Sequence, residues 1–137
     1  MTLPPVNVDT FRHKPVHELS ALLPDESSTT AACHDLGKAG VDLARVQILF
    51  GAEGARILDK HGTEHGYAAR LVRVLQNLGI DENALDVYDE GLRKGETLIT
   101  IPCERASARD IAYLLQPHGG HAMIYWGKGT RELLSAP

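Results

Sequence analysis

Apolar and polar residues alternate along four short stretches of this chain, and this period of two predicts four β-strands. The four stretches are 16–23 (VHELSALL), 44–51 (ARVQILFG), 96–104 (ETLITIPCE) and 121–127 (HAMIYWG). The second is the clearest, because Val46, Ile48 and Phe50 fall on one face and Gln47 and Leu49 fall on the other.

Helical spacing of apolar residues predicts helices between these strands. The first covers 24–40, where Asp25, Ser27 or Ser28 can cap its start and Gly40 can end it. The spacing predicts a long stretch at 52–95 that is helical throughout, and a further helix at 107–119. The final TRELLSAP is interpreted as a short tail, for which a helix is one option.

The order of these elements predicts an α+β fold. It is strand–helix–strand, a helical insert, and strand–helix–strand again. The simplest arrangement is a ferredoxin-like βαββαβ sandwich, with a four-stranded antiparallel sheet and an insert at 52–95 between strands 2 and 3. We expect 15–137 to form this single domain, and 1–14, with its two adjacent prolines, to be a flexible N-terminal arm.

The second face of such a sheet is only half apolar. It would carry Gln47, Leu49, Leu98 and Thr100, together with either His121, Met123 and Tyr125 or Ala122, Ile124 and Trp126. A face of this kind is seldom left in water, so we expect the insert or a second copy of the chain to cover it.

Composition excludes several classes of protein. Hydrophobic residues make up 43% and charged residues 23%, as in soluble globular proteins. The net charge of -4 disfavours a nucleic-acid partner. No apolar run approaches the ~18 residues that cross a bilayer, and no secretory signal is recognised, so we expect a cytoplasmic protein with no membrane partner. Cys33 and Cys103, which lack metal-binding spacing, are expected to be reduced thiols.

The stretch KHGTEHGY at 60–67 holds the first candidate site. His61 and His65 are four residues apart and would share a helix face, where two imidazoles can chelate a divalent ion. Alternatively, Gly62 interrupts the helix and Thr63 caps a new one. A glycine as early in a helix as Gly66 indicates that a neighbouring backbone, or a ligand, passes close by.

The stretch HGGHAMIY at 118–125 holds the second candidate. His121 could begin a sheet face that contains Tyr125 and points toward the insert, where His65 would complete a two-histidine site. Candidate ligand-binding residues are His65, Gly66, His121 and Tyr125, and candidate metal ligands are His61, His65 and His121. The ligand would be a small molecule or a divalent metal; no cofactor and no catalytic residue can be assigned.

Three longer stretches resemble a known family. They are VQILFGAEGARILDKHGTEHGYAARLVRVLQNLG, YDEGLRKGETLITIPCERASARDIAYLLQPHGG and HAMIYWGKGTRELL, within 44–134. This segment is similar to the bacterial heat-induced, general-stress-protein type domain. The resemblance implies a link to the stress response and a ferredoxin-like core, and it implies no reaction, substrate or cofactor.

Two functional hypotheses follow. The first is a non-enzymatic, stress-associated binding module that works as a homo-oligomer, with a homodimer as the simplest form, through its sheet face or insert. The second is a small-ligand or metal-binding protein, with enzymatic activity as an option, whose pocket lies between the insert and the sheet. His65, His121 and Tyr125 would line that pocket.

Overall fold

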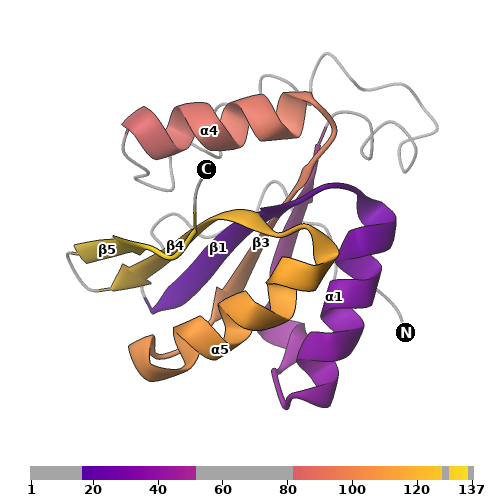
Figure 1. Ribbon diagram of the computed structural model, residues 1–137, viewed down its shortest axis with the longest axis vertical. Helices are drawn as coiled ribbons and strands as arrows, with labels where there is room; N and C mark the ends of the chain where they lie inside the picture. The colour runs from indigo at the N-terminus through magenta and orange to yellow at the C-terminus, as the bar shows by residue number, and fades with distance from the viewer. Residues whose placement is uncertain (1–16, 52–81, 128–129, 136–137) are drawn as a thin grey trace.

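A computed structural model of the chain describes residues 17–51, 82–127 and 130–135 (Figure 1). Its elements, in chain order, are β1 (Glu18–Leu23), α1 (Glu26–Lys38), the 3-10 turn η1 (Leu43–Arg45), β2 (Gln47–Phe50), α4 (Glu82–Arg93), β3 (Thr97–Pro102), α5 (Arg105–Leu115), the 3-10 turn η2 (Gln116–His118), β4 (His121–Gly127) and β5 (Thr130–Leu133). The four predicted strands are confirmed, and so are the predicted helices that fall within the described residues.

Helix α1 starts where the sequence predicts, because Asp25 caps it. The Asp25 carboxylate accepts a hydrogen bond from the Ser28 backbone N–H at 2.7 Å, and this bond lowers the pKa of the carboxyl. Helix α5 differs from the prediction: it begins at Arg105, after Glu104, and no side chain caps it by a hydrogen bond. A serine at 107 therefore lies inside the helix.

The strands form one sheet in the order β2-β3-β1-β4-β5, and every neighbouring pair is antiparallel. The α+β class is confirmed, whereas the expectation of four strands is wrong. The fifth strand comes from the segment interpreted as a tail: its backbone pairs with β4 from Gly127↔Thr130 to Ile124↔Leu133. The backbone hydrogen bonds with β4 decide the conformation of this short segment and override its own weak helix propensity.

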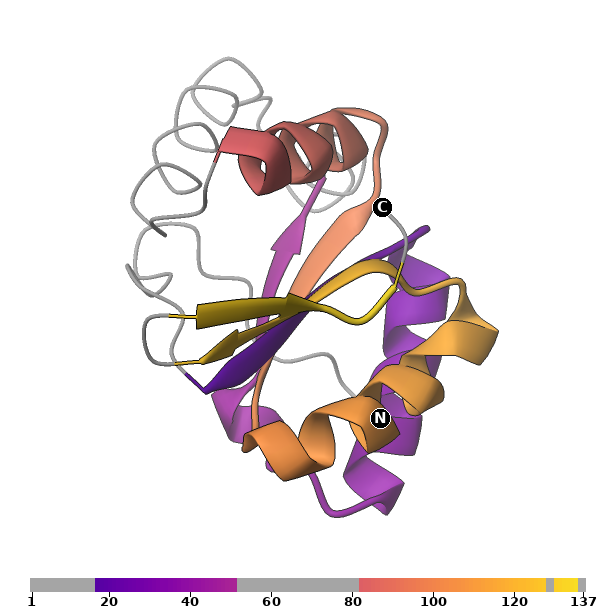
Figure 2. The same ribbon diagram turned by 60° about the vertical axis from the view of Figure 1, so that its left-hand side comes forward.

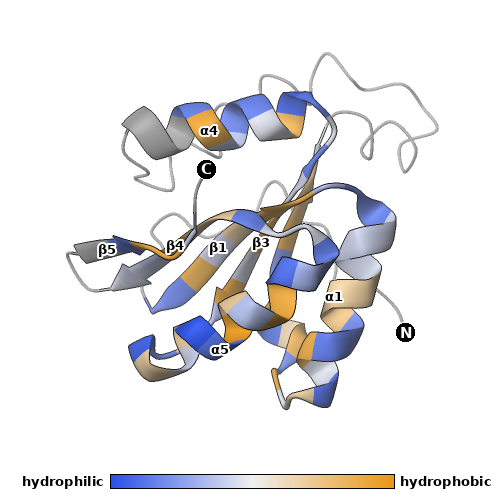
Figure 3. Cartoon of the chain, viewed as in Figure 1, coloured by the Kyte–Doolittle hydropathy of each residue, from blue (hydrophilic) through white to orange (hydrophobic). Residues whose placement is uncertain are grey.

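Helices α1 and α5 cover one face of the sheet (Figure 1). Their apolar sides meet the alternate strand residues that the sequence assigned to this face, including Val46, Ile48 and Phe50. Figure 3 shows the hydrophilic residues of both helices on their outward sides. This face holds the main hydrophobic core.

Helix α4 covers the other face, across the sheet from α1 and α5 (Figures 1 and 2). Its Tyr88 and Leu92 side chains are fully buried. Gly91 allows the close approach, because a Cβ there would come within 2.6 Å of the Leu22 side chain of β1. Since α4 lies in the range predicted as the insert, the insert contributes to the cover of this face, which is one of the two expected alternatives.

A β-bulge in β4 changes which side chains share a face. Ser20 pairs with Ile124, but Leu22 pairs with His121, so one extra residue is accommodated between the two pairs. Ala122, at this irregularity, has a φ of 52°, in the left-handed region. His121 therefore lies on the α4 face with Ile124, which a strict alternation would not allow.

Candidate functional site

The predicted site residues fall in three different places. His61, His65 and Gly66 lie outside the described residues, so the first histidine motif stays a prediction. His121 lies on the α4 face, whereas Tyr125, which pairs with the core residue Leu19, lies on the face covered by α1 and α5. The structure does not bring His121 and Tyr125 together. The sequence reasoning put them on one face because a bulge has no signature in the alternation.

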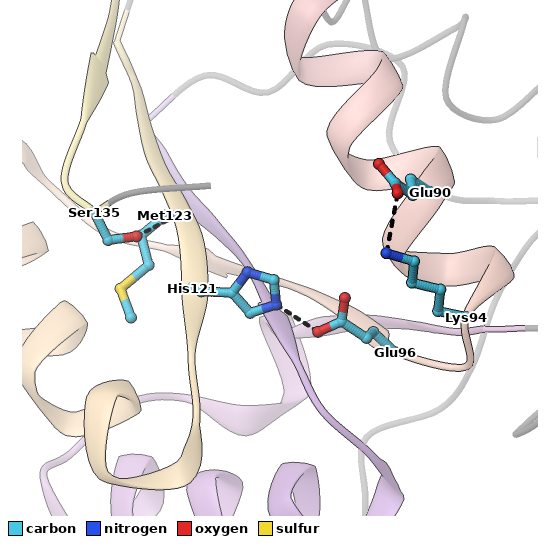
Figure 4. A network of polar contacts seen from close by, with 6 residues as sticks. All are labelled: Glu90, Lys94, Glu96, His121, Met123 and Ser135. Carbon is cyan, nitrogen blue, oxygen red and sulfur yellow. Dashed lines mark hydrogen bonds and ion pairs between the residues drawn. The ribbon is translucent and has the colours of Figure 1, made fainter.

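His121 pairs with Glu96 at the end of the sheet near α4. Figure 4 shows the imidazole of β4 and the carboxylate of the turn before β3 pointing toward each other, joined through Nε2 and Oε2. Both side chains are partly exposed. A carboxylate in this position fixes the tautomer and the orientation of an imidazole. In the described residues, no group of three or more His, Cys, Asp or Glu side chains could hold a metal ion.

The same view contains two contacts that hold neighbouring segments. Lys94 and Glu90 form an exposed ion pair at 3.0 Å within α4 and its following turn, which raises the pKa of the lysine. The Met123 backbone N–H donates to the Ser135 hydroxyl at 2.9 Å, which attaches the chain after β5 to β4. We assign both contacts a structural role, because they connect neighbouring segments and do not line a cavity with His121.

Tyr125 lies at the opposite end of β4. Its hydroxyl is 3.2 Å from Nδ1 of His17. Burial raises the pKa of the tyrosine, and the nearby Cys103 and Glu104 raise it further. Tyr125 is 4% exposed, and its raised pKa keeps the hydroxyl protonated.

A buried hydrogen-bond chain fills the space between α4 and the sheet. The Trp126 indole N–H donates to the Ser20 hydroxyl at 2.8 Å, which in turn donates to the Tyr88 hydroxyl at 2.5 Å. Tyr88 donates to the carbonyl of Ala122 at 2.8 Å. Burial raises the pKa of Tyr88, which keeps it a donor. The sequence predicts a pocket between the insert and the sheet. Among the described residues, the side chains of α4 and the sheet are in direct contact at this place.

An open cavity of about 380 Å³ lies on the other side of the molecule. The cavity lies between the segment that follows α1 on one side and the end of β3 with α5 on the other. Its lining is mixed, with the partly or fully buried Val41, Cys103, Ile111 and Leu114 below and the exposed Asp42, Arg45, Ser107 and Asp110 around the mouth. A volume at the lower end of the range for small-molecule sites, with apolar walls and a few polar groups, is the usual form of a ligand site.

Cys103, a cysteine that is expected from the sequence to be a reduced thiol, lines this cavity in an environment that disfavours the thiolate. Burial raises the pKa of its thiol to about 11, and the carboxylates of Glu18 and Glu104 act in the same direction. At neutral pH the group is a thiol, which is a poor nucleophile and a soft, weakly polar surface. No sequence signal joined the cavity residues to one another, because they come from segments about sixty positions apart and meet only after folding.

No helix in the described ranges is long and apolar enough to cross a bilayer. Comparison of the chain with protein-family models, with curated proteins and with solved structures finds no match. The resemblance to the general-stress-protein type domain therefore stays a prediction.

Proposed function

We propose that this chain is a non-enzymatic binding module that takes a small ligand in the cavity beside Cys103. The observation that carries the proposal is the cavity itself, which combines about 380 Å³ of open volume with apolar walls and charged groups at the mouth. The ligand site thus differs in place from the histidine-lined pocket inferred from the sequence, and it uses none of the same residues.

The framework of this proposal is a ferredoxin-like domain with an added strand. The antiparallel order β2-β3-β1-β4 and the position of α1 and α5 on one face support that assignment (Figure 2). In this arrangement β5 extends the sheet beyond β4. The cavity lies outside the sheet, between α5 and the segment before β2.

Binding, and not covalent chemistry, is what the Cys103 thiol supports. A nucleophilic cysteine needs a lowered pKa, whereas burial raises the pKa of this thiol to about 11. The nearest acidic groups, Glu18 and Glu104, act against the thiolate as well. We therefore assign Cys103 to the wall of the site.

The experiment is a fragment screen followed by amide NMR of the full chain. We expect binding fragments to shift the amide signals of 39–45 and 103–114. Ser107→Phe places a ring in the cavity and should abolish these shifts, because Ser107 is exposed and lines the mouth. Ala106→Phe is the matched control, since Ala106 is exposed on the same helical turn but does not line the cavity. If no fragment at millimolar concentration shifts these amides, the proposed function is wrong.

A second candidate function is self-association through α5 and β5. Tyr113 and Leu133 are 68% and 63% exposed and flank a small hollow of about 160 Å³. Because α4 covers part of the sheet face, this surface is a better candidate for the predicted homo-oligomer than the sheet itself. Light scattering after size exclusion should give a dimer for the parent and a monomer for Tyr113→Ser combined with Leu133→Ser. A parent that stays monomeric at high concentration would exclude this role.

A further inference from the structure

We propose that the ligand of this cavity is a small zwitterion with an apolar body, the chemical class of an apolar α-amino acid. The inference deepens the proposed function and rests on it. It comes from the signs and positions of the charges around the mouth, and from the apolar surface beneath them.

The charged groups at the mouth come from two walls of the cavity, and one of these walls carries both signs of charge. Asp42 and Arg45 belong to η1 and its N-terminal cap, and Asp110 belongs to α5 across the opening. In the described part of the chain, neither Arg45 nor Asp110 has an ion-pair partner within the protein. A ligand that carries both an ammonium and a carboxylate can satisfy the two together.

Asp42 has a partly structural role. Its carboxylate accepts a hydrogen bond from the Ala44 backbone N–H at 3.1 Å, which starts the 3-10 turn and fixes the position of Arg45. A carboxylate holds further acceptor positions beyond this one bond. The mouth thus carries two acidic groups and one guanidinium, which favours a ligand with an ammonium over a simple anion.

The surface below the charges suits a short apolar side chain. Val41 and Leu114 are partly buried and pack against the main core, and Ile111 is 7% exposed. Cys103 adds a neutral thiol. A ligand with charges at one end only would bury its apolar body on this surface and keep its polar end at the mouth. The volume of about 380 Å³ is sufficient for a ligand of this size.

The test compares three probes that share one branched carbon skeleton. Leucine carries both charges, 3-methylbutylamine lacks the carboxylate, and 4-methylpentanoate lacks the ammonium. Amide NMR titration of the full chain should give the tightest binding for leucine, with each single-charge probe about tenfold weaker, since each loses one charge-assisted hydrogen bond.

Variants assign each charge to its residue. Arg45→Gln should weaken leucine about tenfold and leave 3-methylbutylamine unchanged, whereas Asp110→Asn should weaken both of these probes. Arg109→Gln is the matched control, because Arg109 is exposed on α5 and lines the other hollow. It should bind all three probes as the parent does.

The outcomes separate this inference from the proposed function. If leucine and 3-methylbutylamine bind equally, or if leucine produces no shifts while other fragments shift the amides of 39–45 and 103–114, the zwitterion inference is wrong and the binding site stands. If no fragment and no probe shifts these amides, both are wrong. Tighter binding of leucine that depends on Arg45 and Asp110 supports both.

Discussion

Removing a single oxygen atom, by Tyr88→Phe, tests how α4 is held against the sheet. The Tyr88 side chain is fully buried, and its hydroxyl accepts from Ser20 and donates to the carbonyl of Ala122. Phenylalanine preserves the ring packing and removes both hydrogen bonds. The change therefore isolates the polar contribution of the contact between α4 and the sheet.

The expected loss of stability is about 2–3 kcal/mol. A typical hydrogen bond contributes ~1 kcal/mol net, and a buried carbonyl left without a donor costs ~1–3 kcal/mol. Ala122 is 4% exposed, so water does not easily replace the lost donor at its carbonyl. Ser20 still accepts from the Trp126 indole and can rotate its hydroxyl proton, so we expect the total to stay below the sum of the separate costs.

Urea unfolding followed by tryptophan fluorescence measures this loss directly. The chain has one tryptophan, Trp126, which is 7% exposed and belongs to the same hydrogen-bond chain. With a slope of ~2 kcal/mol per molar urea, the midpoint should fall by about 1 M. Tyr113→Phe is the matched control, because Tyr113 is 68% exposed and its hydroxyl should be dispensable.

A double-mutant cycle with Ser20→Ala tests whether the two hydroxyls act together. Because Tyr88 and Ser20 are in direct contact at 2.5 Å, their effects should overlap by ~1 kcal/mol or more. If Tyr88→Phe unfolds within ~0.5 kcal/mol of the parent, as a surface substitution does, the buried chain contributes no stability and the reasoning is refuted.

Three further predictions concern other parts of the fold. A hydrogen bond with His118 lowers the pKa of Asp35 below its ordinary 3.8, so Asp35→Asn should cost stability at neutral pH. The difference in urea midpoint between parent and variant should vanish as the pH falls through that lowered pKa. A difference that does not depend on pH would contradict this. Gly51→Ala should destabilise the protein by ~2 kcal/mol or more, because its Cβ would lie closer than 3.0 Å to backbone carbonyls. Gly37→Ala is the control and should be tolerated in the same urea assay, since its Cβ would meet only a flexible leucine side chain. Equal urea midpoints for the two variants would contradict this. Thiol labelling of the folded protein should modify Cys103 slowly, and the rate should increase as the pH rises toward its pKa of about 11. The fully buried Cys33 should stay unlabelled until denaturant is added. Equal labelling rates for the two cysteines would contradict the assigned burial.

Local patterns in the sequence were sufficient for the first four strands and for the helices among the described residues. The alternation at 44–51 assigned Val46, Ile48 and Phe50 to the core correctly, because neighbouring residues of a strand must point to opposite sides. Asp25 was among the predicted caps of α1, since its carboxylate satisfies a free backbone N–H of the first turn. Helical spacing of apolar residues predicted helix over 52–95, and α4, which lies in this range, buries Tyr88 and Leu92.

Long-range contacts decided what the sequence could not. The strand β5 exists because β4 offers it an edge, and its own residues do not specify this. The bulge near Ala122 separates His121 from Tyr125, although the alternation put them together. Such a bulge depends on how two strands pair, which no single stretch of sequence records.

The candidate site shows the same division most clearly. The cavity joins the segment around Asp42 to Asp110 on α5, and no spacing rule connects these positions. The sequence by itself determined the first four strands, the described helices and most of their apolar sides, because those properties depend on residues within a turn or a pleat of one another. Only the tertiary structure decided the strand order, the face of His121 and the cavity beside Cys103, because these depend on the packing of segments that are far apart in the chain.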